Sequence, residues 1–117
     1  MDYQRGSFKR HEAIKQQILR DPSLIGIQSE NVIHAETEYA LIKRKRPIAR
    51  PDIMIEYLTG STVRRAYIEV KSGSCRRSLQ NLQAQLRKVR RFLDNKRMIG
   101  EVVGVYYTGD LMNVITV

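Results

Sequence analysis

The segment RPDIMIEYLTGSTVRRAYIEVKSG, residues 50–73, constrains the fold of this chain more than any other. Two runs rich in apolar and β-branched residues, 52–58 and 63–71, flank the short sequence Thr-Gly-Ser-Thr. Gly60 followed by Ser61 suits a two-residue loop with glycine first, the pattern of a type II′ turn. The segment therefore predicts two antiparallel strands joined by a tight turn.

A two-residue loop at this position also fixes which side chains of the two strands face each other. Met54 falls opposite Tyr67, and Asp52 falls opposite Glu69. Because side chains alternate along a strand, both acids lie on one face, with Cβ atoms roughly 4.5–5.5 Å apart. Two carboxylates at that separation repel each other unless a positive group lies between them.

A divalent cation would suit this pair of acids better than an amine. Lys71 lies on the same face, but a single ammonium is mobile and monovalent. Mg²⁺ prefers hard oxygen ligands, and the Val70 carbonyl could join the carboxylates of Asp52 and Glu69. A zinc site is not expected, because two histidines and one cysteine are too few and too scattered. The pattern would also fit a plain surface ion pair between Glu69 and Lys71.

The charge of the chain indicates a polyanionic partner. Lysine and arginine total 21 against 12 acids, a formal net charge of +9. The cations cluster in residues 43–50 and 87–91, which favours nucleic acid over a merely soluble basic protein. The residues expected to contact phosphates are Lys43, Arg44, Lys45, Arg46, Arg50, Arg76, Arg87 and Arg91. An ordinary solvated loop and helix face remain the alternative for them.

Two segments predict helices. Residues 7–20 begin at Ser7, a favoured N-cap residue, and Asp21-Pro22 stops them. Their apolar face is interrupted by His11 and Lys15, with Glu12 at its edge. Residues 76–97 predict a clearer helix, since one apolar stripe recurs at steps of three and four. That stripe consists of Leu79, Leu82, Leu86, Val89 and Leu93, and beside it runs a polar stripe of Arg76, Gln80, Gln83, Arg87 and Arg91.

The remaining segments predict strands. Residues 31–43 fit a strand or a helix, and a strand is favoured because the neighbouring segments need a sheet partner. Residues 102–107 are apolar on both faces, as in a central strand, and residues 111–117 could add an edge strand. The predicted fold class is α/β, a mixed sheet flanked by helices in the order α-β-β-β-α-β.

The size and composition of the chain fit one domain over residues 1–117. No apolar run reaches the roughly 18 residues that a membrane helix needs. The single cysteine excludes an internal disulfide, and the polar N-terminal segment lacks the apolar core of a secretory signal. We therefore expect a cytoplasmic protein with no membrane partner.

These residues resemble the PD-(D/E)xK nuclease superfamily, which has the restriction-endonuclease-like fold. The match consists of Pro51-Asp52, a hairpin, and then Glu69-Val70-Lys71, within an element order similar to that family's core over most of the chain. The small size and early helix are similar to archaeal Holliday-junction resolvases and short viral nucleases. The resemblance implies a single nuclease domain, a Mg²⁺-dependent endonuclease for DNA, with Mn²⁺ as an alternative ion and branched DNA as one possible substrate.

The resemblance also implies roles for individual residues. Asp52, Glu69 and the Val70 carbonyl would bind the metal ion, and Lys71 would orient the attacking water and steady charge on the phosphate. Many members add a glutamate from the N-terminal helix, which Glu12 matches by position; Glu36 or Glu38 could substitute for it. Some members carry a glutamine in the helix after the lysine, a part open to Gln83 or Gln80.

Other implications concern assembly and the rival functions. The Q-x-x-x-Y signature of RecB-like members is missing, which argues against that subfamily. Analogy with small nucleases predicts a homodimer. The main alternative function is a non-catalytic, basic nucleic-acid-binding module of the same fold. A protein-assembly subunit, with the apolar stripe of residues 79–93 as a dimer seam, is a further alternative.

Overall fold

The computed structural model describes the backbone of residues 2–117 and the side chains of residues 8–117. The helical elements are α1 (Asp2–Arg20), the 3₁₀ turns η1 (Pro22–Ile25) and η2 (Ser29–Asn31), and α2 (Arg76–Asn95). The strands are β1 (Val32–Thr37), β2 (Leu41–Lys43), β3 (Arg46–Ala49), β4 (Ile53–Thr59), β5 (Thr62–Lys71), β6 (Glu101–Thr108) and β7 (Leu111–Thr116).

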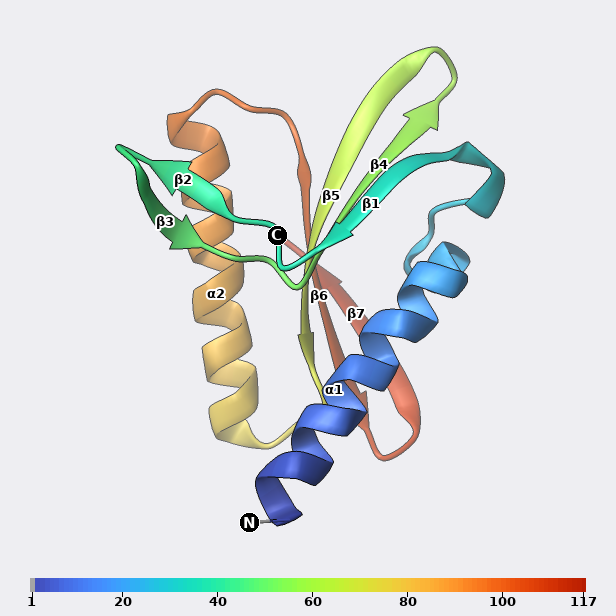
Figure 1. The fold of residues 1–117 in the computed structure, drawn as a ribbon, viewed down its shortest axis with the longest axis vertical. Helices are drawn as coiled ribbons and strands as arrows, with labels where there is room; N and C mark the ends of the chain where they lie inside the picture. Colours follow the sequence, from blue (N-terminus) through green and yellow to red (C-terminus); the bar gives the residue numbers. More distant parts are fainter. Residues whose placement is uncertain (1) are drawn as a thin grey trace.

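Within residues 2–117, five strands form one mixed sheet in the order β1-β4-β5-β6-β7 (Figure 1). Neighbouring strands are antiparallel except β5 and β6, which run parallel. A parallel pair needs a crossover connection, and α2 provides it between β5 and β6. β6 lies between β5 and β7 and is buried along most of its length, as its hydropathy predicts, and β7 forms the expected edge strand.

The predicted register of the hairpin is confirmed. Thr59 pairs with Thr62 and Met54 pairs with Tyr67, so the strands are not slipped by a residue. Gly60 has a φ of +63°, a left-handed conformation that glycine adopts at little cost and that the first position of a II′ turn requires.

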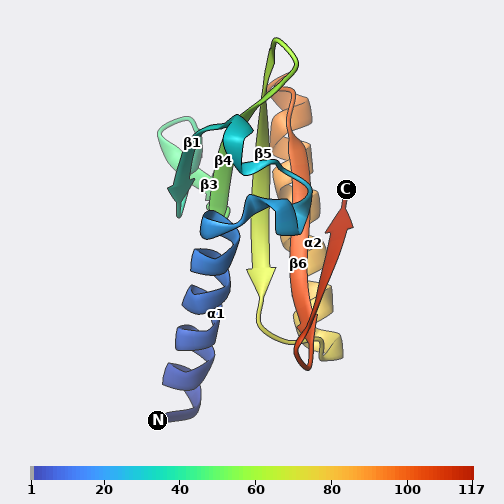
Figure 2. The ribbon, with the colours of Figure 1, turned by 90° about the vertical axis from the view of Figure 1, so that its right-hand side faces the viewer.

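The two helices cover opposite faces of the sheet (Figures 1 and 2). Ile14 and Ile18 of α1 pack in one apolar cluster with strand residues such as Ile53 and Ile68. The stripe of α2 packs on the other face against Met54 and neighbouring strand residues. Strand alternation therefore sends successive residues of β4 and β5 into two separate cores.

Gly104 in β6 allows α2 to lie close to the sheet. A Cβ atom at this position would stand 2.7 Å from Cδ1 of Leu86 and 3.0 Å from Cγ1 of Ile115. The first of these distances is shorter than real Cβ contacts, so a side chain here would have to displace Leu86 of α2.

The structure is mixed α/β, as predicted, but the start of the first helix and the number and order of the strands differ from the prediction. The first helix begins at Asp2, so Ser7 lies inside it and is not its N-cap. Residues 31–43 form two strands, β1 and β2, because the chain bends at Glu38, which has a φ of +51°. β2 then pairs with β3 in a separate two-stranded ribbon, and β3 lies within the basic cluster of residues 43–50, where the sequence predicts no strand. The Asp21-Pro22 stop is confirmed, since α1 ends at Arg20.

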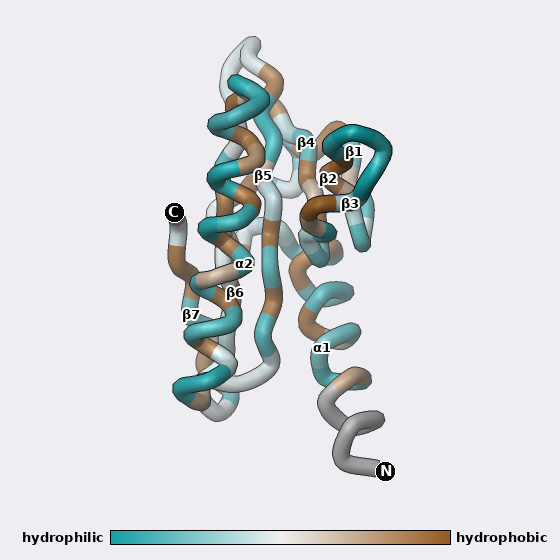
Figure 3. The backbone as a smooth tube through the Cα atoms, turned by 90° about the vertical axis from the view of Figure 1, so that its left-hand side faces the viewer, coloured by the Kyte–Doolittle hydropathy of each residue, from teal (hydrophilic) through white to brown (hydrophobic). Residues whose placement is uncertain are grey.

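The β2–β3 ribbon lies against α2 (Figure 1). Leu41 is buried in the core beneath α2, with Ile48 and Ala49 packed against the same cluster. The turn of the ribbon is formed by Arg44 and Lys45, at φ values of +53° and +65°, and is hydrophilic (Figure 3). The ribbon thus has an apolar base and a cationic end. In the described part of the chain, no helix is long and apolar enough to cross a membrane.

Candidate active site

Asp52 and Glu69 lie together where β4 begins and β5 ends, and main-chain hydrogen bonds hold them there. The N–H of Asp52 donates to Oε1 of Glu69 over 3.1 Å. In return the N–H of Val70 donates to Oδ2 of Asp52 over 2.7 Å. These reciprocal bonds continue the register of the hairpin beyond its last ladder pair, Ile53 with Ile68. Asp52 and Glu69 therefore lie next to each other, as the hairpin register predicts.

Glu69 is the more buried of the two acids, with 6% of its surface exposed. Burial, followed by the nearby Asp52 carboxylate, raises the pKa of Glu69 to about 7. The hydrogen bond from the Asp52 N–H and the charge of Lys71 act in the opposite direction. A carboxyl group held this way at neutral pH is typical of sites that bind a cation or transfer a proton.

His11 of α1 reaches across to the same site. Its Nε2 atom lies 3.1 Å from the Val70 carbonyl oxygen and 3.4 Å from Oδ1 of Asp52. The hydrogen bond to Asp52 raises the pKa of His11. One ring nitrogen therefore stands between two of the oxygens that the sequence assigned to a metal ion.

Lys15, one turn farther along α1, joins two more acids to the site. Only 2% of its surface is exposed, and its Nζ atom lies 3.1 Å from Glu12 and 2.7 Å from Glu38. Burial alone would lower the pKa of Lys15, but the bonds to Glu38 and Glu12 outweigh it, so the pKa is raised. Glu12 and Glu38, both candidates for the fourth acid, thus share one buried ammonium.

The bend after β1 brings Glu38 to this position. The N–H of Glu38 donates to the Asp52 carbonyl and the N–H of Tyr39 donates to that of Pro51, both over 3.0 Å. These bonds fasten the bend to the start of β4. A left-handed glutamate is uncommon, and such conformations persist only where the surroundings enforce them.

On the α2 side, Glu69 lines an open hollow of about 320 Å³ together with Arg50, Gln85 and Lys88. A neighbouring hollow of about 300 Å³ is lined by Lys71, Asn81, Ala84, Gln85 and Lys88. Lys88 lines both hollows. Lys71 in one hollow and Glu69 in the other therefore face one continuous basic surface. A phosphate group is complementary in charge to that surface.

The other predicted residues occupy different positions. Gln83 and Arg87 are exposed on α2 and are not among the residues lining these hollows, whereas Gln85 and Lys88 are. Arg76 is exposed in the first turn of α2. Glu36 is exposed on β1, where it pairs with His34. The cluster Lys43, Arg44, Lys45 and Arg46 forms the end of the ribbon, and Arg91 lines a third hollow that lies between the ribbon and α2.

The donor atoms at the site fit a hard divalent cation. Asp52, Glu69 and the Val70 carbonyl offer oxygen atoms, and Mg²⁺ in proteins takes one or two carboxylates together with waters and phosphate oxygens. Oδ1 of Asp52 and the Val70 oxygen are near enough to contact one ring nitrogen of His11. Among the residues described, no three His, Cys, Asp or Glu side chains are grouped to hold a metal by themselves. A bound ion would therefore depend on the carbonyl and on water.

Sequence reasoning missed His11, Lys15 and Lys88 as site residues. The signal for the first two was present, since both interrupt the apolar face of α1 and so point toward the sheet. Lys88 lies beside the apolar stripe of α2, on the side opposite the predicted polar stripe that includes Gln83 and Arg87. Which flank faces the site depends on how α2 lies on the sheet.

The comparisons with known proteins gave no match to a family model, a curated protein or a solved structure.

Proposed function

We propose that this protein is a metal-dependent nuclease of the PD-(D/E)xK, restriction-endonuclease-like type, which hydrolyses phosphodiester bonds of DNA. The observation that carries the proposal is the meeting of Asp52 and Glu69 beside Lys71, at the edge of a basic hollow. Two acids and a lysine in this arrangement match the chemistry of phosphoryl hydrolysis. The positive surface beside them supplies the attraction for the substrate.

Each residue would have a defined part. Asp52, Glu69 and the Val70 carbonyl would hold Mg²⁺ or Mn²⁺, which would polarise the phosphate and lower the pKa of a water molecule. Lys71 would orient that water or stabilise the negative charge that develops on the phosphate. Arg50 and Lys88, which line the same hollow as Glu69, would hold the phosphates on either side. Such contacts position a strand without reading its sequence.

Lys15 would serve as a support for the site. It pairs with Glu12 and Glu38 and so offsets part of their negative charge, although Glu38 still helps to raise the pKa of Glu69. His11 holds Asp52 and the Val70 carbonyl, so its ring would have to turn aside or bind the ion through Nε2. Glu12 therefore supports the site through Lys15, which differs from the direct metal ligand that the resemblance implies.

The test is cleavage of labelled single-stranded, duplex and branched DNA with Mg²⁺ or Mn²⁺. Asp52→Asn keeps an oxygen for the Val70 N–H but removes the charge, and Lys71→Ala removes the ammonium. We expect both to lose cleavage by at least about a hundredfold while still binding DNA in EDTA. Asp110→Asn, in the exposed turn before β7, is the matched control. Undiminished cutting by Asp52→Asn or Lys71→Ala would refute the catalytic assignment.

A second function, a non-catalytic nucleic-acid-binding module, is favoured by one observation. Asp52 and Glu69 each accept a main-chain N–H, so the pair also serves to fasten β4 to β5. Under this alternative the wild-type protein binds DNA with a steep salt dependence but cuts none of the substrates with either ion. The homodimer stays a prediction, which light scattering with and without DNA would test.

A further inference from the structure

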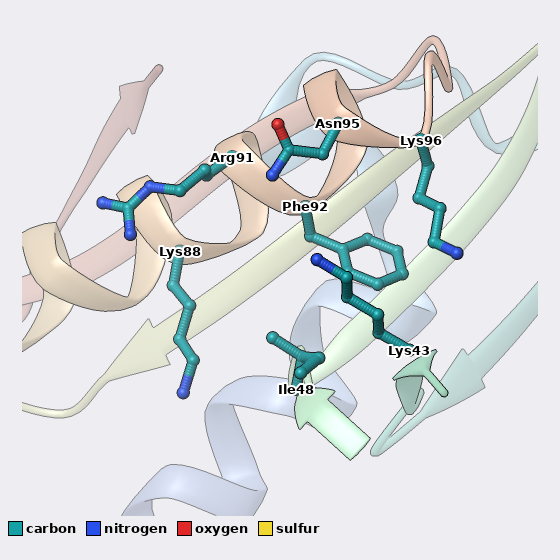
Figure 4. A pocket seen from close by; sticks show the side chains of 7 residues that line it. All are labelled: Lys43, Ile48, Lys88, Arg91, Phe92, Asn95 and Lys96. Carbon is teal, nitrogen blue, oxygen red and sulfur yellow. The ribbon is translucent and has the colours of Figure 1, made fainter. Parts of the chain in front are cut away.

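A third hollow lies between the β2–β3 ribbon and the C-terminal half of α2 (Figure 4). It has a volume of about 190 Å³. Its apolar lining consists of Ile48 from the ribbon and Phe92 from α2, and Figure 4 shows Phe92 projecting from α2 toward Ile48 and Lys43. Drug-sized ligands occupy pockets of about 300–1,000 Å³. This smaller hollow therefore suits one flat ring system.

Four cations line the hollow together with these two apolar residues. Lys43 comes from the ribbon, and Lys88, Arg91 and Lys96 come from α2 and the residue after it. No acid lines the hollow, and none of the four cations forms an ion pair with a carboxylate among residues 8–117. The surroundings therefore favour an anionic ligand that carries an apolar, planar part.

The hollow adjoins the candidate active site. Ile48 and Lys88 line both this hollow and the one that contains Glu69. A strand with its phosphate beside Glu69 could therefore continue past Lys88 into the space between the ribbon and α2. A nucleotide has the required combination of charge and ring, and Asn95 at the rim offers an amide to the edge of a base.

We propose that this hollow binds one unpaired nucleotide of single-stranded DNA, with its base against Ile48 and Phe92 and its phosphates held by Lys43, Lys88, Arg91 and Lys96. The base must be unpaired, because the faces of a base inside a duplex are covered by its neighbours. The inference rests on the proposed function, since it takes the reacting strand to run through both hollows. It adds that the substrate has a single-stranded segment next to the bond that is cut.

The test compares two labelled strands of equal length and charge in EDTA, one of thymidines and one of abasic sites, by fluorescence anisotropy. Because the phosphates are the same, a difference in Kd reports the bases alone. We expect the strand with bases to bind about tenfold tighter, the scale of one base packed on a protein surface. Equal affinity for the two strands would overturn the inference.

A pair of variants connects that difference to the hollow. Ile48→Asp puts a carboxylate into the lining of the hollow, and Ile42→Asp makes the same change at an exposed position on the same ribbon. We expect Ile48→Asp to abolish the preference for bases and Ile42→Asp to retain it. If both variants behave alike, the base does not bind here. Asn95→Asp, with Gln16→Glu on α1 as its control, repeats the comparison at exposed helix positions where folding is not at risk.

The outcome is separable from that of the nuclease proposal. Wild-type protein that cuts DNA but does not distinguish thymidine from abasic strands would overturn this inference alone. Protein that prefers bases, loses that preference with Ile48→Asp, and cuts nothing with Mg²⁺ or Mn²⁺ would overturn the nuclease proposal alone.

Discussion

The N–H of Asp52 donates a hydrogen bond of 3.1 Å to Oε1 of Glu69, so one acid of the pair is fixed by the backbone of the other. The Val70 N–H completes the exchange by donating to Asp52. Two carboxylates that repel each other are thus held in place by the same hairpin register that brought them together. This arrangement has consequences that can be measured in the absence of any substrate.

Glu69→Gln should stabilise the metal-free protein at alkaline pH. The pKa of Glu69 is raised to about 7 from an ordinary value of 4.5, so the folded state holds its proton more tightly than the unfolded state. The stability from this proton is fully present below pH 4.5 and is lost as the pH rises through about 7. At pH 8 the charged, buried carboxylate costs on the order of 3 kcal/mol.

Urea unfolding in EDTA at pH 4 and pH 8 would check this prediction. The glutamine keeps an oxygen for the Asp52 N–H, so the variant should match the wild type at pH 4 and exceed it at pH 8. Glu36→Gln, on the exposed part of β1, is the control. A variant equally or less stable than the wild type at pH 8 would show that Glu69 is not strained by its burial.

His11→Ala should tighten Mg²⁺ binding if the nuclease proposal holds. In the folded protein Nε2 of His11 lies against both Oδ1 of Asp52 and the Val70 oxygen, which are two of the proposed ligand atoms. A hard ion prefers oxygen donors, so the imidazole would compete with it for these atoms. Removing the ring should lower the Mg²⁺ dissociation constant several-fold at pH 7.5.

Isothermal titration with Mg²⁺ measures this effect directly. Weaker binding by the alanine variant would instead identify His11 as a ligand of the ion. His34→Ala, an exposed histidine of β1, should leave the titration unchanged.

Lys88→Ala should weaken DNA binding and flatten its dependence on salt. Lys88 lines all three hollows on the α2 side, so we expect it to contact a phosphate. Losing one phosphate contact lowers the slope of log K against log salt by about 0.7 for single-stranded DNA. Anisotropy between 50 and 200 mM NaCl, about the range over which such contacts are screened, measures that slope.

The control for this measurement is Arg20→Ala, which removes an equal charge from α1 on the other face of the sheet. Equal slopes for the two variants would mean that only total charge matters. In that case the α2 surface would have no special part in holding DNA.

Gly104→Ala should destabilise the fold by about 1–3 kcal/mol, because the new methyl group would meet Leu86 and Ile115 at 2.7 and 3.0 Å. Gly73→Ala is the matched control, since nothing lies within 4 Å of a Cβ atom there. Thermal unfolding of both variants checks the prediction. A Gly104→Ala protein as stable as the Gly73→Ala protein would mean that α2 does not press on β6.

The sequence by itself determined the hairpin and with it the pairing of Asp52 with Glu69. A two-residue turn and a strict alternation of side chains leave one register, and both are local properties of residues 50–73. The stripe of α2 and the burial of β6 were likewise readable from periodicity and hydropathy. These predictions succeeded because each depends on neighbours within one element or one turn.

The tertiary structure alone decided which other residues join that pair. The bend at Glu38 divides residues 31–43 into two strands. It is held by main-chain hydrogen bonds to Pro51 and Asp52, which cannot be predicted from the local sequence. Lys15 reaches Glu38 and His11 reaches Asp52 only because α1 packs on the sheet above them. The flank of α2 that carries Lys88 faces the site because the apolar stripe of α2 packs on the other face of the sheet. Each of these contacts joins elements that are far apart in the chain. Their positions depend on how the apolar faces of the helices and the sheet pack together.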